Sequence, residues 1–278
     1  MMLRKAGADW KKGIPCNIRR RDSSHHHLRI REYEISCPPL AGRSLFFISD
    51  LHAQTKTAWS LPAFRHWSGL NWIRQVLYDA VGQCKPDYFV FGGDLTADAC
   101  MIPEALELLR DLPGKMQKIA VPGNWDLRRE WLNGDFWHKS YQEIGFHFLQ
   151  NKGILLDGIR FYGADDFKKG NPVFPQELPD APFHCILFHN PDTFALLPLR
   201  LTQHNGMMLA GHTHGGQVRI PGFGALYGST IVWKRFENGM YHSPRSNMPL
   251  LVSSGIGTSW FPIRVFCPPE AIHIHFTS

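Results

Sequence analysis

Carboxylate, amide and imidazole side chains recur in short polar turns spread over the middle of the chain. They form an ordered set: Asp50, His52, Asp94, Asn124, His189, His212 and His214. Such a mixture of oxygen and nitrogen ligands suits first-row divalent metal ions. Two metal ions bridged by one carboxylate, about 3.5 to 4 Å apart, are a recurrent device for in-line displacement at phosphorus. The residue types therefore predict a metal site suited to phosphate-ester chemistry.

The polar turns follow short apolar runs that are typical of buried strands. The first three runs are 45–48 before Asp50, 88–91 before Asp94 and 119–121 before Asn124. Helices are expected over residues 60–81, with Ser60 as a cap and Pro62 in the first turn, and over residues 102–111. Further strands are expected at residues 146–149, 154–157, 159–162, 185–188, 207–210, 250–253 and 271–276. Because ligands gather outside the carboxyl ends of parallel strands, this order predicts an α/β fold that brings the distant turns together.

The excess positive charge is confined to the first 44 residues. The chain has 30 Lys and Arg against 24 Asp and Glu, a formal charge of +6, and residues 1–44 hold ten of these bases and four of these acids. The remainder is electrically neutral, which disfavours a basic stripe on the folded body and therefore nucleic acid as a partner. Residues 1–44 are predicted to form a basic arm, either solvated or drawn to an anionic membrane surface by Arg19, Arg20 and Arg21.

The spacing of the cysteines and the hydropathy of the chain indicate in which cellular compartment the protein works. The six cysteines include no Cys-X-X-Cys pair, which argues against a zinc ribbon or a disulfide scaffold. No apolar run reaches the ~18 residues of a spanning helix, and no signal-peptide pattern follows the early charges. The expected location is the cytoplasm, with peripheral attachment to the inner membrane left open.

Five short motifs occur in the order in which a known family has them. They are Asp-X-His at 50–52, Gly-Gly-Asp-X-X-X-Asp at 92–98, Gly-Asn-X-Asp at 123–126, His-Asn-Pro-Asp at 189–192 and Gly-His-Thr-His-Gly-Gly-Gln at 211–217. Through these motifs the chain resembles the calcineurin-like metallophosphoesterases. The resemblance implies a four-layer α-β-β-α sandwich with two mixed sheets. This domain would occupy residues 45–278, behind a basic arm and first strand in residues 1–44.

The resemblance also implies how the metal ligands divide. One ion would be held by Asp50, His52, Asp94 and His214, and the other by Asp94, Asn124, His189 and His212. Asp94 would bridge the two ions. The expected catalytic residues are Asp94, Asn124 and His212. Manganese is the expected metal, while iron, zinc and magnesium stay open because the ligand types do not separate them.

The tail of the chain suggests a branch of the family. Residues 254–259, with 262–264 and 267–270, look like a bacterial branch that includes membrane-associated phosphodiesterases and the chlamydial-type UDP-2,3-diacylglucosamine hydrolase. The main hypothesis is therefore hydrolysis of the diphosphate of such a nucleotide-linked lipid, giving UMP and the lipid 1-phosphate of lipid A synthesis. The alternatives are a broad-specificity phosphodiesterase and a non-catalytic scaffold that binds metal.

One residue departs from the family's usual Gly-Asn-His-Asp motif, since position 125 is tryptophan. In the family, that histidine contacts the scissile phosphate and protonates a poor leaving group, which an indole N–H cannot do. Lost general acid catalysis typically costs about 10²- to 10⁴-fold, but a pyrophosphate leaving group needs no proton. Trp125 therefore favours a diphosphate substrate. Trp125 and Arg128, just past the same turn, are the expected substrate contacts, with Arg128 reaching a phosphate.

Two further groups of side chains matter for the site and its surroundings. The aromatic residues Trp131, Phe136, Trp137 and Tyr141 either line an apolar pocket for an acyl chain or pack a helix on the core. His273 and His275 alternate with apolar residues, which is typical of the exposed face of a strand.

Overall fold

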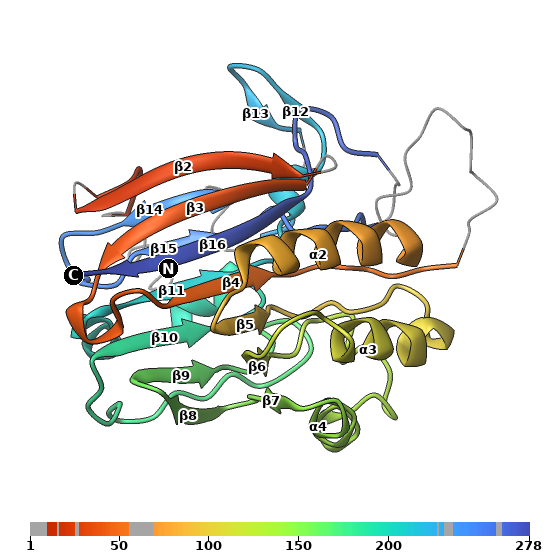
Figure 1. Ribbon diagram of the computed structural model, residues 1–278, viewed down its shortest axis with the longest axis horizontal. Helices are drawn as coiled ribbons and strands as arrows, with labels where there is room; N and C mark the ends of the chain where they lie inside the picture. Colours follow the sequence, from red (N-terminus) through yellow and green to blue (C-terminus); the bar gives the residue numbers. More distant parts are fainter. Residues whose placement is uncertain are drawn as a thin grey trace.

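The computed structural model describes residues 10–15, 17–25, 28–55, 69–226, 228–230, 236–259 and 263–278. Within them the chain forms two mixed seven-stranded sheets (Figure 1). Sheet I has the order β1 (Lys11–Lys12), β14 (Gly239–His242), β15 (Leu250–Val252), β11 (Gly206–Ala210), β10 (Phe183–Leu187), β9 (Ile159–Gly163), β8 (Lys152–Leu156). Sheet II has the order β2 (Ile18–His25), β3 (Leu28–Ser36), β16 (Glu270–Thr277), β4 (Ser44–Ile48), β5 (Tyr88–Phe91), β6 (Gln117–Ala120), β7 (Phe146–Phe148).

Apolar side chains from both sheets fill the space between them. Phe47 and Val90 of sheet II meet Phe161 and Leu187 of sheet I in one buried cluster. Fully burying an aliphatic or aromatic side chain of this size contributes roughly 1.5 to 3 kcal/mol. The two sheets are therefore held face to face by the alternate residues of their strands.

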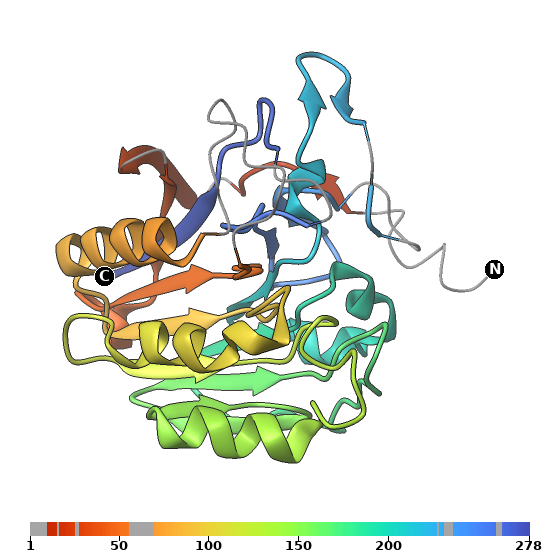
Figure 2. The ribbon, with the colours of Figure 1, turned by 90° about the vertical axis from the view of Figure 1, so that its right-hand side faces the viewer.

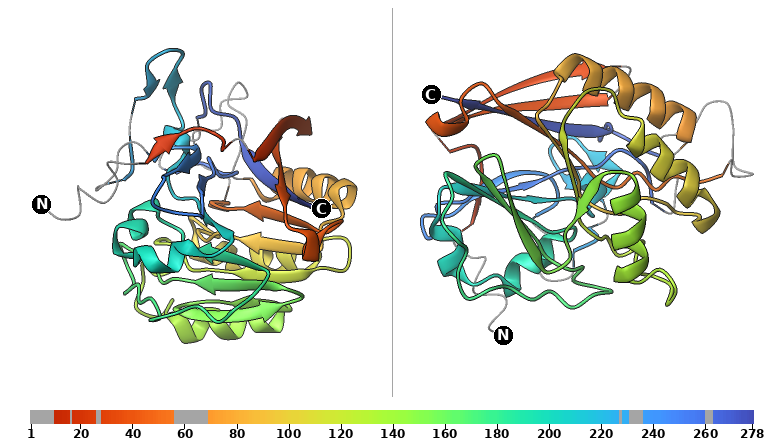
Figure 3. Two further views of the ribbon diagram at one scale, coloured as in Figure 1. Left: turned by 90° about the vertical axis from the view of Figure 1, so that its left-hand side faces the viewer. Right: turned by 60° about the horizontal axis from the view of Figure 1, so that its bottom comes forward.

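Three α-helices within the described residues lie on one side of the molecule and cover the outer face of sheet II (Figures 1 and 3). They are α2 (Leu70–Cys84), α3 (Ile102–Arg110) and α4 (Gly134–Glu143). Ile73, Val76 and Leu77 of α2 are fully buried at helical spacing, in a core shared with Phe46 and Phe89 of the sheet. In the part of the chain described, no helix combines the length and apolar composition that a bilayer span requires.

The outer face of sheet I is covered differently. The short 3₁₀ helices η3 (Pro191–Leu196) and η4 (Leu199–Gln203) pack there, with Phe194 and Leu201 buried beside Trp10. The remaining 3₁₀ helices are η1 (Pro38–Leu40), η2 (Ala99–Met101) and η5 (His214–Gly216). The hairpin of β12 (Arg219–Ile220) and β13 (Gly224–Ala225) projects from the body (Figure 2). The α/β class with two mixed sheets is confirmed, and 3₁₀ helices form the fourth layer in place of α-helices.

Most elements lie where the apolar runs predicted them. The strands from β4 to β11, with β15 and β16, each overlap a predicted strand, and α3 matches the helix expected over residues 102–111. The first expected helix is present as α2, and its last turn is closed by Lys85 in the left-handed conformation, at φ 45°. Residues 56–68, which include Ser60 and Pro62, lie outside the described residues.

The N-terminal segment contributes strands to the sandwich. β2 and β3 form an antiparallel hairpin, and β3 pairs in parallel with β16 along its whole length. The alternation of side chains along β3 explains why this strand lies inside the sandwich. Leu28 and Ile30 point into the helix-covered core, while Tyr33 and Ile35 point into the core between the sheets. Residues 18–25 and 28–36 are therefore part of sheet II rather than a separate arm. The division of the chain at residue 44 stays a prediction.

Candidate metal centre

The turns that carry the predicted ligands follow neighbouring strands. In sheet II, β4, β5 and β6 are parallel, and their last residues Ile48, Phe91 and Ala120 lie side by side. In sheet I, β10 and β11 are parallel, with Leu187 opposite Leu209. The turns after these strands therefore meet at one end of the sandwich.

Six of the seven predicted ligands lie in two buried clusters. One cluster is Asp50, His52 and His214, and the other is Asp94, His189 and His212. Within each cluster, one ligand atom of every residue lies within 4.8 Å of the others. All six side chains are buried. The two clusters are consistent with a dinuclear metal site.

Asp94 lies between the two clusters. Its Oδ2 atom is 3.3 Å from Nε2 of His52 and 3.1 Å from Nε2 of His189. Its other oxygen, Oδ1, accepts a hydrogen bond of 2.8 Å from the backbone N–H of Trp125. One carboxylate oxygen thus faces a histidine of each cluster, which is where a bridging ligand has to lie.

The orientation of the remaining donors fits metal ions. His189 donates its Nδ1 proton to the carbonyl oxygen of Gly92 at 2.8 Å, so its Nε2 atom points at the cluster. That Nε2 atom is 3.1 Å from Nδ1 of His212. Oδ1 of Asn124 is buried and has no hydrogen-bond partner among the described residues. A buried oxygen left unpaired costs about 1 to 3 kcal/mol, and a bound cation would satisfy it. The donor set therefore fits two divalent ions, and it does not fix their identity.

Five of the ligands have a backbone conformation that non-glycine residues rarely adopt. Their φ angles are 57° at Asp50, 43° at His52, 60° at Asp94, 70° at His212 and 50° at His214. Hydrogen bonds between the turns hold this conformation. The N–H of His52 donates to the carbonyl oxygen of Asp94 at 3.1 Å, and that of His212 donates to the Asp50 carboxylate at 3.0 Å. Such strain persists only where its surroundings over-determine it, and it is common at functional sites.

Two glycines allow the turns after β5 and β6 to touch. A Cβ atom on Gly123 would lie 2.2 Å from Oδ1 of Asp94, and one on Gly93, at φ +90°, would lie 2.6 Å from the backbone nitrogen of Gly123. The Asp126 carboxylate ties the same turns together, because it accepts hydrogen bonds from the N–H groups of Asp94 and Gly123 at 2.8 Å and of Leu95 at 2.9 Å.

Burial and charge set the protonation of the ligands. Burial holds the pKa of His212 and that of His214 well below the ordinary value, so both are neutral imidazoles that can bind a cation. Burial opposes a charge on His189 as well, but the carboxylates of Asp94 and Asp50 outweigh it and raise the pKa of His189 to about 10. The carboxylates thus stabilise positive charge at this point, which is the electrostatic condition for binding a metal ion.

Lys168 is a neighbour of the centre that the sequence analysis missed. Its Nζ atom lies 2.8 Å from Nε2 of His212 and donates a hydrogen bond of 3.0 Å to the carbonyl oxygen of Ser229. Its backbone N–H donates to the carboxylate of Asp166 at 2.8 Å. No motif contains Lys168, and its only signal is its place shortly after β9, in a turn rich in aspartate.

Arg264 is a second missed neighbour. Its guanidinium donates hydrogen bonds to the carbonyl oxygens of Ser254 at 2.8 Å and Gly257 at 3.0 Å, and it lies 3.5 Å from Nδ1 of His214. The N–H of Gly257 in turn donates to the carbonyl oxygen of Asp50 at 2.7 Å. Arg264 thereby holds the loop after β15 against the ligand turns. It stands in the tail that resembled the bacterial branch, and that resemblance was its signal.

The two predicted substrate contacts lie against each other beside the centre. The rings of Trp125 and His52 meet edge to face, with their centroids 5.1 Å apart. The guanidinium of Arg128 lies 4.4 Å from the centroid of the same indole and donates a hydrogen bond to the carbonyl oxygen of Ala97. Arg128 is thus held by protein groups, and its contact with a phosphate stays a prediction.

The aromatic segment packs on the core. Trp137 and Tyr141 of α4 are buried in the core between sheet II and its helices. Nε1 of Trp137 donates a hydrogen bond of 2.8 Å to the carbonyl oxygen of Asp126. For these two residues the helix-packing interpretation is confirmed and the acyl-pocket interpretation is wrong. The helix α4 supports the Asp126 turn.

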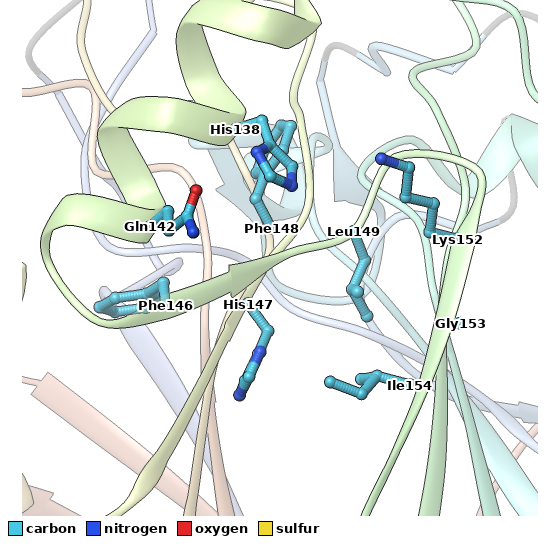
Figure 4. A pocket seen from close by; sticks show the side chains of 9 residues that line it. All are labelled: His138, Gln142, Phe146, His147, Phe148, Leu149, Lys152, Gly153 and Ile154. Carbon is cyan, nitrogen blue, oxygen red and sulfur yellow. The ribbon is translucent and has the colours of Figure 1, made fainter.

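One cavity, of about 260 Å³, lies between α4, β7 and β8 (Figure 4). Its lining includes His138, His147 and Lys152. None of its lining residues belongs to either His/Asp cluster. This cavity is therefore separate from the candidate metal centre.

Comparisons with known proteins point to one family. The profile of the calcineurin-like phosphoesterases matches residues 44–216. The chain is 30% identical over 203 residues to the uncharacterized metallophosphoesterase YkuE of Bacillus subtilis (strain 168), covering 68% of each protein. It is 24% identical over 236 residues to the phosphodiesterase YaeI of Escherichia coli (strain K12), covering 81% of this chain and 79% of YaeI. Among solved structures it is similar to a dimetal phosphatase from Danio rerio, with a TM-score of 0.46 and 13% identity, over 78% of this chain and 89% of that one. Since the family profile matches more than half of its length, the chain belongs to the calcineurin-like phosphoesterase family.

Proposed function

We propose that this metal-dependent phosphoesterase hydrolyses a phosphodiester or pyrophosphate bond in a phosphorylated small molecule or lipid. The observation that carries the proposal is the single oxygen of Asp94 that faces a histidine of each buried cluster. An arrangement of this kind supports two metal ions on either side of one carboxylate, which is the geometry for in-line displacement at phosphorus.

The residues of the centre have separate proposed roles in metal binding, catalysis and attraction of the substrate. Two divalent ions, with Mn²⁺ as the proposed pair, would supply Lewis acidity and activate a water for attack on phosphorus. The proposed ligands are Asp50, His52, Asp94 and His214 for one ion and Asp94, Asn124, His189 and His212 for the other. Asp94, Asn124 and His212 are the proposed catalytic residues. Lys168, beside His212, adds a positive charge at the edge of the site that would attract an anionic substrate.

Trp125 supports a preference among phosphate esters. Its backbone is tied to Asp94 and its ring packs on His52, so the side chain stands where the usual motif has a proton donor. The indole cannot protonate a leaving group. We therefore propose substrates whose leaving group departs without a proton, such as aryl esters and diphosphates.

UDP-2,3-diacylglucosamine is one diphosphate of this class. The wider hypothesis, a phosphodiesterase whose substrate is still to be assigned, has the better support, because the relative YaeI is described as a phosphodiesterase. The nucleotide-lipid hypothesis rests on Trp125 and on the tail of the chain.

A substrate panel with purified protein and Mn²⁺ tests the preference. The panel holds bis(p-nitrophenyl) phosphate, UDP-2,3-diacylglucosamine with detergent, a nucleotide sugar and an unactivated alkyl phosphodiester. We expect the alkyl diester, whose alkoxide leaves poorly without a proton, to be at least about 100-fold slower than the diphosphate substrate, the usual cost of a missing general acid. Equal rates on the alkyl diester and the activated or diphosphate substrates would remove the argument from Trp125.

The Asp94→Ala variant separates an enzyme from a metal-binding scaffold. It removes the shared carboxylate, so we expect hydrolysis of bis(p-nitrophenyl) phosphate to fall to background. The matched control is Glu143→Ala, which removes an exposed carboxylate at the end of α4 and should keep full activity. Metal-dependent turnover that survives in Asp94→Ala would contradict the proposal, and a wild-type protein without turnover would favour the scaffold.

We also propose contact with an anionic membrane surface through the N-terminal hairpin. The proposal rests on Arg19 and Arg21, whose side chains are 84% and 76% exposed on the outermost strand of sheet II. Each basic side chain that lies near an anionic membrane surface contributes about 1 kcal/mol to the free energy of binding.

A further inference from the structure

A second group of metal-ligand side chains lies on the outer face of sheet II. Glu32 stands on β3, and His273 and His275 stand on the neighbouring strand β16 (Figure 1). His273 pairs with Glu32 in the parallel register, and side chains two residues apart on a strand share a face. One ligand atom of each of the three residues lies within 4.8 Å of the others. None of the three belongs to the clusters of the candidate metal centre.

His273 is buried without a polar partner. The residue is 3% exposed, although the alternation of the strand predicted an exposed face, and that prediction is wrong. Neither of its ring nitrogens has a hydrogen-bond partner among the described residues. Its ring lies 5.7 Å from that of Phe46 and 4.0 Å from that of His275, between centroids. A buried nitrogen left unpaired costs about 1 to 3 kcal/mol, and a bound metal ion would satisfy it.

The charges on the strands around the cluster are compatible with a cation. Burial, followed by the neighbouring His275, lowers the pKa of His273 to about 3, so its ring is neutral and offers a lone pair. Arg21 of β2 stands opposite Glu32, but it lies 4.0 Å from Glu34 and its side chain is 76% exposed. The carboxylate of Glu32 is therefore available at the cluster.

The side chain of Cys84, at the end of α2, carries no charge. Burial, with the charge of Glu32, raises the pKa of the Cys84 thiol at the end of α2 to about 11, so the thiol is neutral. On the other side, β4 contributes the ring of Phe46.

We propose that Glu32, His273 and His275 bind one Zn²⁺ ion, separate from the dinuclear centre. Two imidazoles and a carboxylate, with a fourth position open to water, are a common donor set for zinc in proteins. Glu32 and His275 are half-buried, so an ion can enter from solvent, while His273 closes the inner side. The ion would cross-link β3 to β16 and so fasten the N-terminal hairpin to the middle of sheet II. The proposed site does not depend on the proposed function.

Zinc counting on matched variants tests the proposal. Every protein compared lacks an affinity tag and has His25, His26 and His27 replaced by serine, because a run of three histidines also binds zinc. Glu32→Gln and His275→Ala each remove one ligand from a half-buried position. Glu34→Gln is the control, since it removes a carboxylate from the same face two residues along the strand. Each full-length protein is dialysed against Zn²⁺ and the bound metal is measured by elemental analysis, with far-UV circular dichroism to verify folding.

We expect both ligand variants to bind one equivalent of zinc fewer than Glu34→Gln. At limiting zinc, the zinc affinity of this site should fall at least about 10-fold in both ligand variants. Replacing even a residue that only hydrogen-bonds to a metal ligand commonly costs that much. Zinc should also raise the unfolding temperature of the control more than that of either ligand variant. If folded Glu32→Gln and His275→Ala bind as much zinc as the control, with the same affinity, the proposed site is wrong.

Discussion

The turns that carry Asp94 and Gly123 can lie in contact only because residue 123 has no side chain. A Cβ atom there would lie 2.2 Å from Oδ1 and 2.4 Å from the backbone nitrogen of Asp94, distances that force the turns apart. We expect Gly123→Ala to lower kcat/KM for bis(p-nitrophenyl) phosphate about 100-fold, because a displacement of about 1 Å at a reacting centre has that cost. Gly82→Ala is the control, since its Cβ meets only Pro113 at 3.8 Å, an ordinary contact. Unchanged activity in Gly123→Ala would show that catalysis does not depend on the close contact between Asp94 and residue 123.

Lys168 tests the role of charge at the edge of the centre. Because its Nζ lies 2.8 Å from His212, it can attract the anionic substrate without being a metal ligand. We expect Lys168→Ala to raise KM about tenfold and to change kcat less. A tenfold rise corresponds to the free energy that one hydrogen bond to a charged group contributes. Lys168→Arg should restore part of the loss, and Lys169→Ala, an exposed neighbour, should have none. A KM that stays at the wild-type value in Lys168→Ala would contradict this role.

The residues of the two buried His/Asp clusters were predictable from the sequence, but their neighbours were not. Asp50, Asp94 and His212 stand at the ends of apolar runs, where sequence alone indicates a strand end and a functional turn. Lys168 and Arg264 reach the centre from loops after β9 and β15, and nothing in their local sequence shows where those loops pack. Long-range packing decides such contacts.

At the scale of elements, β3 is joined to β16 by a buried ion pair. Arg31 Nη2 lies 2.7 Å from Glu270 Oε2, and the two side chains are 5% and 1% exposed. We expect Arg31→Met to lower the free energy of unfolding by about 3 to 5 kcal/mol, because it leaves a buried carboxylate without its partner. Combining it with Glu270→Leu should recover much of that loss. Urea denaturation measures both, with the exposed Arg19→Met as the control.

A small effect of Arg31→Met would contradict the view that β3 is integral to sheet II. One first strand was expected within residues 1–44, but the hairpin of β2 and β3 was not, because the sequence there is dense in charge and that density indicated a basic arm. The two-residue alternation of Leu28 and Ile30 with Arg29 and Arg31 was the signal for a strand. Arg31 can be buried because its guanidinium pairs with the carboxylate of Glu270 on β16, and this partner is more than 200 residues away in the sequence.

At the scale of the whole molecule, the positive charge is partly neutralised within sheet II. Arg31 pairs with Glu270 and Arg20 pairs with Asp22. Arg19 and Arg21 each lie 4.0 Å from Glu34, but their side chains remain 84% and 76% exposed. Deletion of residues 1–30 would remove β2 and the start of β3, so substitutions are the better test of membrane contact.

We expect the double change Arg19→Ser with Arg21→Ser to weaken binding to anionic phosphatidylglycerol vesicles roughly 30-fold, at about 1 kcal/mol for each basic side chain. Lys115→Ser with Lys139→Ser removes the same charge from exposed positions elsewhere and should bind as the wild type does. Equal vesicle binding by the two double variants would contradict membrane contact through β2.

In the proposed dinuclear centre, one carboxylate, Asp94, is shared by two metal ions at the end of the sandwich. Anomalous diffraction from crystals grown with Mn²⁺ measures this directly, because it locates each ion independently of the protein atoms. We expect two peaks, about 3.5 to 4 Å apart, on either side of the Asp94 carboxylate. A single peak there, or peaks that lie away from Asp94, would contradict the assignment of a dinuclear centre.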